Sequence, residues 1–81
     1  MRIDKFLKVS RLLKRRTVAG EAAKGGRIKI NGKTVKPAHE VKPDDIIEIG
    51  LQSGTVKVRV LAVKETVRKE EVDSLYEVIT D

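Results

Sequence analysis

The stretch that decides the fold is GRIKINGKTV, residues 26–35. Ile28 and Ile30 alternate with two cations, and a period of two places the isoleucines on one face of a strand and the cations on the other. The dipeptide Asn31-Gly32 favours a two-residue type I′ turn, because both central residues of that turn need a positive φ. The stretch therefore predicts a β-hairpin whose second strand follows the glycine.

Two helices are predicted ahead of this hairpin. Over residues 3–13 an apolar stripe recurs with helical spacing, formed by Ile3, Phe6, Leu7 and Ser10. Thr17 is a suitable N-cap for a second helix over residues 18–24. Gly25 and Gly26 suit the left-handed turn that commonly ends a helix. The chain thus changes from a helical period to a strand period at the start of the hairpin.

Downstream, strand patterns and one charge-rich segment complete the domain. Pro43 sets the φ angle for a turn at residues 42–45. The remaining predictions are a strand over 46–49, a loop over 50–54, a strand over 55–63, a short helix over 65–74 and a closing strand over 75–80. The predicted fold is α+β, with two N-terminal helices on a small, mostly antiparallel sheet. At 81 residues the chain, 1–81, is expected to be a single domain.

Composition argues against several function classes. The chain has no cysteine and one histidine, and no nucleophile, base and orienting group fall into a plausible set. Metal-ligand spacing is absent as well. We therefore predict no enzyme activity, no metal and no cofactor. No apolar run approaches the roughly 20 residues that a membrane span needs, and no secretory signal is evident, which favours the cytosol.

The charge is distributed unevenly along the chain. Residues 1–36 carry 12 Lys or Arg against two acids, a net charge of +10, whereas residues 37–81 carry six against ten, a net charge of −4. The whole chain has a net charge of +6. A charge that only kept the protein soluble would not need to segregate. The asymmetry predicts that the N-terminal half faces a polyanion.

The candidate binding residues are the cations of this N-terminal half. One group recurs every three residues and continues into a basic cluster: Arg2, Lys5, Lys8, Arg11, Lys14, Arg15 and Arg16. Cations at a helix entry oppose the helix dipole and repel one another, and this local cost favours a function. A second group is weaker, because outward hairpin cations also protect sheet edges: Arg27, Lys29, Lys33 and Lys36. Cations on two short helices suit a structured RNA recognised by shape and phosphate position.

Four blocks of this sequence resemble a known family in order and spacing. They are Arg2–Leu7, Lys14–Thr17, Gly26–Lys33 and Val41–Asp45. Together they resemble the S-four-type RNA-binding domain, or alpha-L motif, over about residues 1–50. The resemblance implies that the two helices and the adjoining loop form the RNA-binding face.

The start of the chain and the tail blocks Lys69–Glu71 and Leu75–Glu77 resemble the RqcP subfamily, relatives of a small heat-shock ribosome-binding protein. That resemblance implies a cytoplasmic, ribosome-associated protein that binds large-subunit rRNA and peptidyl-tRNA on stalled, split ribosomes. It further implies help to the factor that adds C-terminal tails to nascent chains during ribosome-associated quality control. A monomer is the default for so small a module. The long basic C-terminal extension of the proteobacterial relative has no counterpart here, so its contacts are not carried over.

A general nucleic-acid-binding domain is the alternative, with DNA or free tRNA as its target. Phosphate contacts dominate both kinds of binding, so positive charge alone does not separate them. No long recognition helix with base-reading side chains is evident, which counts against sequence-specific DNA binding. The residues themselves do not decide between the large subunit and another RNA.

Overall fold

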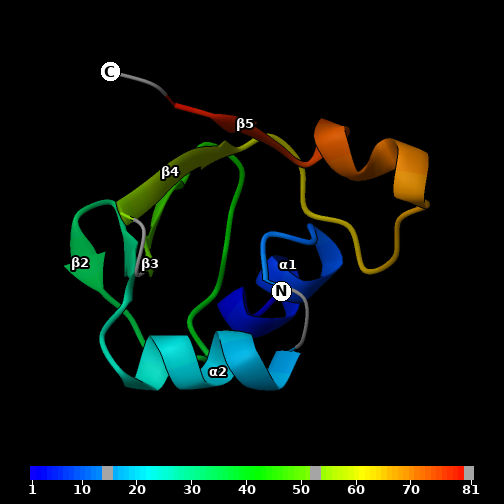
Figure 1. Ribbon diagram of the computed structural model, residues 1–81. Helices are drawn as coiled ribbons and strands as arrows, with labels where there is room; N and C mark the ends of the chain where they lie inside the picture. Colours follow the sequence, from blue (N-terminus) through cyan, green and yellow to red (C-terminus); the bar gives the residue numbers. More distant parts are fainter. Residues whose placement is uncertain (14–15, 52–53, 80–81) are drawn as a thin grey trace.

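The computed structural model describes residues 1–13, 16–51 and 54–79 (Figure 1). Its helices are α1 (Ile3–Val9), α2 (Arg16–Lys24) and the 3₁₀ helix η1 (Lys69–Ser74). Its strands are β1 (Ile28–Ile30), β2 (Lys33–Thr34), β3 (Ile46–Leu51), β4 (Gly54–Val60) and β5 (Tyr76–Val78). They form one sheet in the order β2-β1-β3-β4-β5, and each described pairing is antiparallel. The predicted α+β class and antiparallel sheet are confirmed.

The predicted hairpin is present between β1 and β2. Asn31 has φ 53° and Gly32 has φ 85°, as a type I′ turn requires. The Asn31 carboxamide also ties the turn to the next part of the sheet. Its oxygen accepts from the Ile46 N–H (3.0 Å), and its nitrogen donates to the Asp45 carboxylate (3.1 Å). The turn residue therefore has two structural uses, one through its backbone and one through its side chain.

One face of the sheet forms the core with α1. The buried side chains of this face are Ile28, Ile30, Ile47, Ile49, Val58 and Val60. Predicted stripe residues Ile3, Phe6 and Leu7 of α1 are fully buried against them. The opposite face of the sheet carries charges, because Lys29 pairs in register with Glu48 and Glu48 with Lys57. The alternation read from the sequence thus separates an apolar face under α1 from a charged outer face.

The first helix is shorter than the prediction for residues 3–13. It ends at Val9, and Ser10 caps it with a buried hydroxyl that donates to the Leu7 carbonyl (3.2 Å). Arg11 follows in the left-handed region, with φ 62°. Leu12 and Leu13 then pack against the core from the turn rather than from a helix. Their apolar side chains continue the helical spacing in the sequence, and for this reason the predicted helix was too long at its C-terminal end.

The second helix begins earlier than predicted. It starts at Arg16, so Thr17 lies within α2 and is not its N-cap. Its C-terminal end is as predicted. Gly26 has φ 76°, its N–H donates to the Ala23 carbonyl (3.1 Å), and the Arg27 N–H donates to the Ala22 carbonyl (2.9 Å). This pair of bonds is a Schellman turn, which satisfies carbonyls that the helix end leaves open. Helix α2 packs against α1.

The predicted turn at residues 42–45 is confirmed. The Asp45 N–H donates to the Lys42 carbonyl (3.1 Å), and Asp44 has φ 75°. The Asp45 carboxylate accepts from the Lys42 N–H (2.9 Å) as well as from Asn31. Both acidic residues are thus turn formers.

The C-terminal elements differ from the predictions at their ends. Strands β3 and β4 extend to Leu51 and Gly54, so little of the predicted 50–54 loop remains, and residues 52–53 lie outside the described part. Strand β4 leaves the sheet after Val60 instead of at residue 63. The closing strand, predicted over 75–80, covers Tyr76–Val78.

The predicted helix over 65–74 is present only as the 3₁₀ helix η1. Residues 61–68, here called the connecting segment, have no regular secondary structure. The β-branched pair Thr66-Val67 in this segment lowers helix propensity. Val67 instead packs against the core.

Candidate nucleic-acid interface

Two cations near the start of α1 are bound by carboxylates of the chain itself. Arg2, just before the helix, places Nη2 3.1 Å from the Asp4 carboxylate, which is 7% exposed. Lys5 pairs with Glu65 of the connecting segment, 60 residues away. The Lys5 ammonium holds the pKa of the Glu65 carboxyl below its ordinary value through a hydrogen bond and direct charge attraction. Both predicted binding residues therefore also hold parts of the fold together.

The C-terminal end of α1 carries two exposed cations. Lys8 and Arg11 are exposed, and neither has an ion-pair partner among the described residues. The Arg11 N–H donates to the Lys8 carbonyl (3.0 Å), which fixes the two residues next to each other. A non-glycine residue in the left-handed region costs roughly 1–2 kcal/mol. The chain thus keeps a guanidinium at a position that favours glycine.

The loop before β3 lies along the start of α1. The Ile3 N–H donates to the His39 carbonyl (2.8 Å), and the Val41 N–H donates to the Met1 carbonyl (2.9 Å). The Met1 ammonium binds the Glu40 carboxylate (2.9 Å) and lowers the pKa of that carboxyl. The exposed Lys36 belongs to the same loop. The structure therefore brings Lys36 close to the N-terminus of α1.

The hairpin cations point in more than one direction. Lys29 lies on the outer face of the sheet, opposite Glu48, and so faces away from α1. Arg27, just before β1, lines a cavity of about 320 Å³. Lys33 lines another of about 380 Å³, shared with His39 and Lys42. The structure does not gather these three cations into one surface with Lys8 and Arg11.

The basic cluster between the helices is only partly described. Lys14 and Arg15 lie outside the described residues. Arg16 begins α2, and its side chain is likewise outside the description. All three remain predictions.

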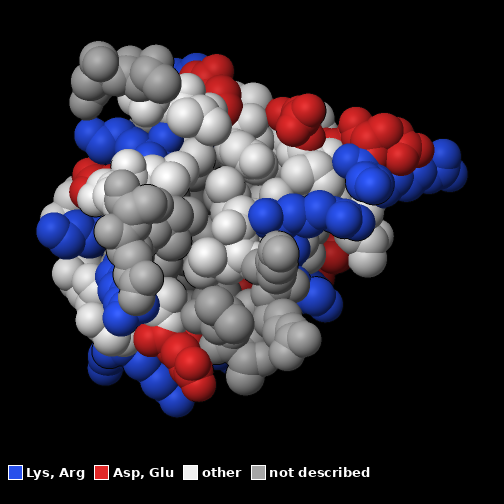
Figure 2. Space-filling view, in the orientation of Figure 1, with Lys and Arg blue, Asp and Glu red and all other residues white. Residues whose placement is uncertain are grey.

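Acidic residues gather at a different end of the molecule. Figure 2 shows red atoms beside blue ones where η1 lies in Figure 1, and η1 contains Glu70, Glu71 and Asp73. Across residues 1–13, 16–51 and 54–79, no cluster of His, Cys, Asp and Glu has the geometry of a metal site. In the same ranges, no helix is both long and apolar enough to cross a membrane.

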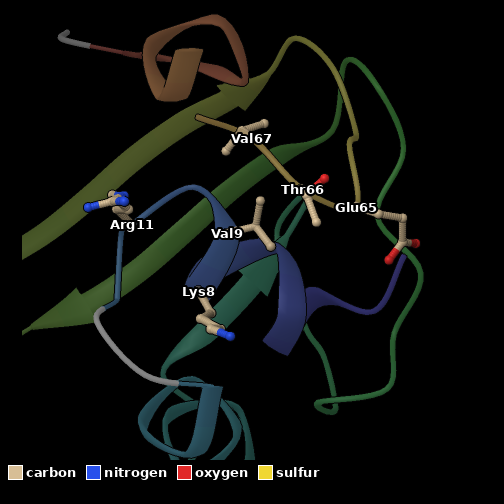
Figure 3. Close-up of a pocket in the computed structure, with 6 residues that line it drawn as sticks. All are labelled: Lys8, Val9, Arg11, Glu65, Thr66 and Val67. Atoms are coloured by element: carbon tan, nitrogen blue, oxygen red, sulfur yellow. The ribbon is translucent and has the colours of Figure 1, made fainter. Parts of the chain in front are cut away.

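Lys8 and Arg11 border a groove that the sequence did not predict. It has a volume of about 600 Å³ and is lined by Lys8, Val9, Arg11, Glu65, Thr66 and Val67 (Figure 3). The connecting segment supplies half of this lining. Its residues have no recognisable motif, and the ion pair to Lys5 and the packing of Val67 bring them to α1. Nothing in the sequence pattern marked these contacts.

Comparison with solved structures shows the same fold in other proteins. The trimeric structure of Vibrio cholerae Heat Shock Protein 15 superposes with a TM-score of 0.90 at 25% identity, over 98% of this chain and 81% of that one. The solution structure of a hypothetical protein gives a TM-score of 0.85 at 30% identity, over 100% of this chain and 99% of that one.

Comparison with known families and proteins agrees with this likeness. Residues 1–47 match the family model of the S4 domain. Over 78 residues the chain is 54% identical to the RQC P-site tRNA stabilizing factor of Halalkalibacterium halodurans, covering 96% of this chain and 89% of the relative. The proteins of the same name from Bacillus subtilis and Streptococcus pneumoniae are 47% and 46% identical over all 81 residues, which cover 94% and 92% of their lengths. The chain therefore belongs to the S4 domain family and, within it, to the RQC P-site tRNA stabilizing factors.

Proposed function

We propose that this protein binds rRNA of the large ribosomal subunit and peptidyl-tRNA on stalled, split ribosomes. In this role it assists the factor that adds C-terminal tails to nascent chains in ribosome-associated quality control. The observation that carries the proposal is the match over the whole chain to proteins named for stabilizing P-site tRNA. The N-terminal excess of positive charge and the exposed Lys8 and Arg11 support it physically. The proposal places the protein in the cytoplasm, on the ribosome.

The proposed action is binding rather than catalysis, by one domain over residues 1–81. The four N-terminal arginines, Arg2, Arg11, Arg15 and Arg16, would grip phosphates through their planar, bidentate guanidinium groups. The lysines Lys5, Lys8 and Lys14 would add to the positive electrostatic potential that attracts the RNA backbone. If about six phosphates are neutralised, affinity should fall by roughly three orders of magnitude between 50 and 200 mM salt. We propose a monomer, to be compared by sedimentation with the trimer described for the Vibrio cholerae relative.

Sucrose-gradient sedimentation of lysate at low and moderate salt tests this function. Wild-type protein should travel with large subunits enriched in peptidyl-tRNA, whereas Arg16→Ala should stay at the top of the gradient with an almost unchanged melting temperature. Lys69→Ala, which removes an exposed lysine in the acidic η1, is the matched control and should still co-sediment. Wild-type protein that stays at the top, or that spreads over all nucleic acid, would refute the proposal. Equal competition by duplex DNA or free tRNA would favour a general nucleic-acid-binding domain.

A further inference from the structure

The groove between the end of α1 and the connecting segment has the size of a ligand site. Its volume of about 600 Å³ exceeds the 310–380 Å³ of three other cavities in the described part of the molecule. Pockets for small ligands commonly span about 300–1,000 Å³. In Figure 3, Arg11 and Glu65 lie at opposite ends of the groove, with Val9, Thr66 and Val67 between them.

Both walls of the groove are fixed by contacts with the rest of the molecule. Val9 and Val67 are half-buried and pack against the core, so their positions follow from the fold. The ion pair between Lys5 and Glu65 joins the connecting segment to α1 beside the groove. Only Thr66 between these anchors is exposed, and its hydroxyl both donates and accepts hydrogen bonds. The floor of the groove is therefore apolar with one small polar group.

The rim of the groove is basic at one end. Lys8 and Arg11 are exposed and without ion-pair partners in the described part of the chain. The left-handed backbone of Arg11, φ 62°, carries a strain that a glycine would remove. At the other end lies the Glu65 carboxylate, whose pKa the Lys5 ammonium lowers through a hydrogen bond and charge attraction. A polyanion is therefore attracted to the Arg11 end more than to the Glu65 end, where Lys5 and Glu65 offset each other's charge.

We propose that this groove is a subsite for one unstacked nucleotide of the bound RNA. Arg11 binds its phosphate while Lys8 adds positive charge nearby, its base lies on Val9 and Val67, and the Thr66 hydroxyl bonds to the base edge. Proteins bind single RNA bases that leave the helix by placing them on apolar, aromatic or guanidinium surfaces. A continuous duplex offers no such base, and a bare phosphate would not use the apolar floor. The inference rests on the proposed RNA binding and adds the kind of RNA feature that is recognised.

A stem-loop with a single bulged 2-aminopurine is the probe, compared at 50 mM salt with the same stem-loop without the bulge. Wild-type protein should bind the bulged RNA about tenfold more tightly, since covering part of one base face with apolar side chains and adding one hydrogen bond gives a gain of about that size. The 2-aminopurine fluorescence should rise, because the base leaves its neighbours for a surface without aromatic rings. Millimolar adenosine monophosphate should not compete; competition would mean a site for free nucleotides and would overturn the assignment to RNA.

Two groove variants and one control separate this inference from RNA binding in general. Thr66→Gln fills the groove from an exposed position and should abolish the tenfold preference, while affinity for the unbulged RNA stays within twofold. Val67→Ala removes part of the floor and should reduce the preference, whereas Lys69→Ala should retain it. Equal binding of both RNAs by the wild type would overturn the inference and leave the proposed function standing. Failure to bind either RNA or ribosomes would overturn both.

Discussion

The two ends of α1 carry similar cations and use them differently. Near the start, Arg2 and Lys5 are bound to Asp4 and Glu65, so their charges help to hold the fold. In the last turn of the helix and just beyond it, Lys8 and Arg11 have no such partner in the described ranges. The carboxylate offsets part of the charge of a paired cation, so that cation attracts a phosphate less strongly than an unpaired one. The comparison teaches that a basic stripe in a sequence is not uniformly available to RNA.

The largest expected effect comes from removing the unpaired cations. The double variant Lys8→Ala/Arg11→Ala should lower affinity for large subunits by about a hundredfold at 50 mM salt, because two charge-assisted contacts are lost. The slope of log affinity against log salt should become shallower by about two. Fluorescence anisotropy titrations between 50 and 200 mM salt measure both quantities.

The matched control for this double variant lies on the outer face of the sheet. Lys57 and Arg59 pair with Glu48 and Glu77, so Lys57→Ala/Arg59→Ala makes the same change in net charge. Its affinity should stay within a few fold of wild type. An equal loss in both double variants would mean that only net charge matters, and the distinction between paired and unpaired cations would fail.

A stability effect is expected at the start of α1. Arg2→Ala removes a charged hydrogen bond to the buried Asp4 carboxylate and should lower the free energy of unfolding by about 1 kcal/mol. For a domain of this size that corresponds to a fall in melting temperature of roughly 4–8 °C. Thermal unfolding followed by circular dichroism gives the value, with Lys36→Ala, an exposed cation of the adjoining loop, as the control. An unchanged melting temperature would show that Arg2 is not structural.

A smaller, opposite effect on binding is expected at Glu65. Glu65→Gln removes the carboxylate that holds Lys5 and should raise RNA affinity about threefold at 50 mM salt. The salt slope should steepen by about one, because one more cation becomes available to phosphate. Titrations of this variant and of Glu77→Gln, whose carboxylate pairs with Arg59 instead, make the comparison. A loss of affinity in Glu65→Gln would show that the ion pair holds the binding surface in shape.

The smallest effect concerns acid stability. The pKa of Glu65 is lowered by the hydrogen bond and charge of Lys5, so its unfolded-state pKa is the higher of the two. Its contribution to stability is therefore present above the ordinary value of 4.5 and is lost as the pH falls through the folded pKa. Denaturant titrations at pH 7 and at pH 3 should differ less for Glu65→Gln than for wild type. An identical pH dependence in the two proteins would contradict this assignment.

How much the sequence predicts depends on how local the cause is. The hairpin could be predicted because Asn31 and Gly32 supply the turn themselves. The left-handed Arg11 could not, since a glycine usually marks such a turn and the apolar Leu12 and Leu13 continued the helical pattern. The helix predicted over residues 65–74 was too long. The many charges of this segment are typical of an exposed helix, and that signal outweighed the low helix propensity of the β-branched Thr66 and Val67.

The candidate site shows the same limit. The cations of residues 1–36 could be found by composition, because their excess is large. Which of them are paired could not, since Lys5 and Glu65 are 60 residues apart and only the folded chain brings them together. The groove beside Arg11 was missed for that reason, as half of its lining comes from the connecting segment.

The carboxamide in the hairpin turn has a consequence for chemical ageing. Asparagine followed by glycine is the dipeptide that deamidates most readily, because the glycine nitrogen attacks the side-chain carbonyl carbon. In the folded protein the Asn31 side chain is held on both sides, by the Ile46 N–H and by the Asp45 carboxylate. That restraint opposes the rotation needed for attack, so folding protects the asparagine from deamidation. Deamidation in a chain that unfolds would set a new carboxylate against Asp45, and the repulsion would weaken the hairpin on refolding. Molecules that have spent time unfolded would therefore carry a lasting mark of it.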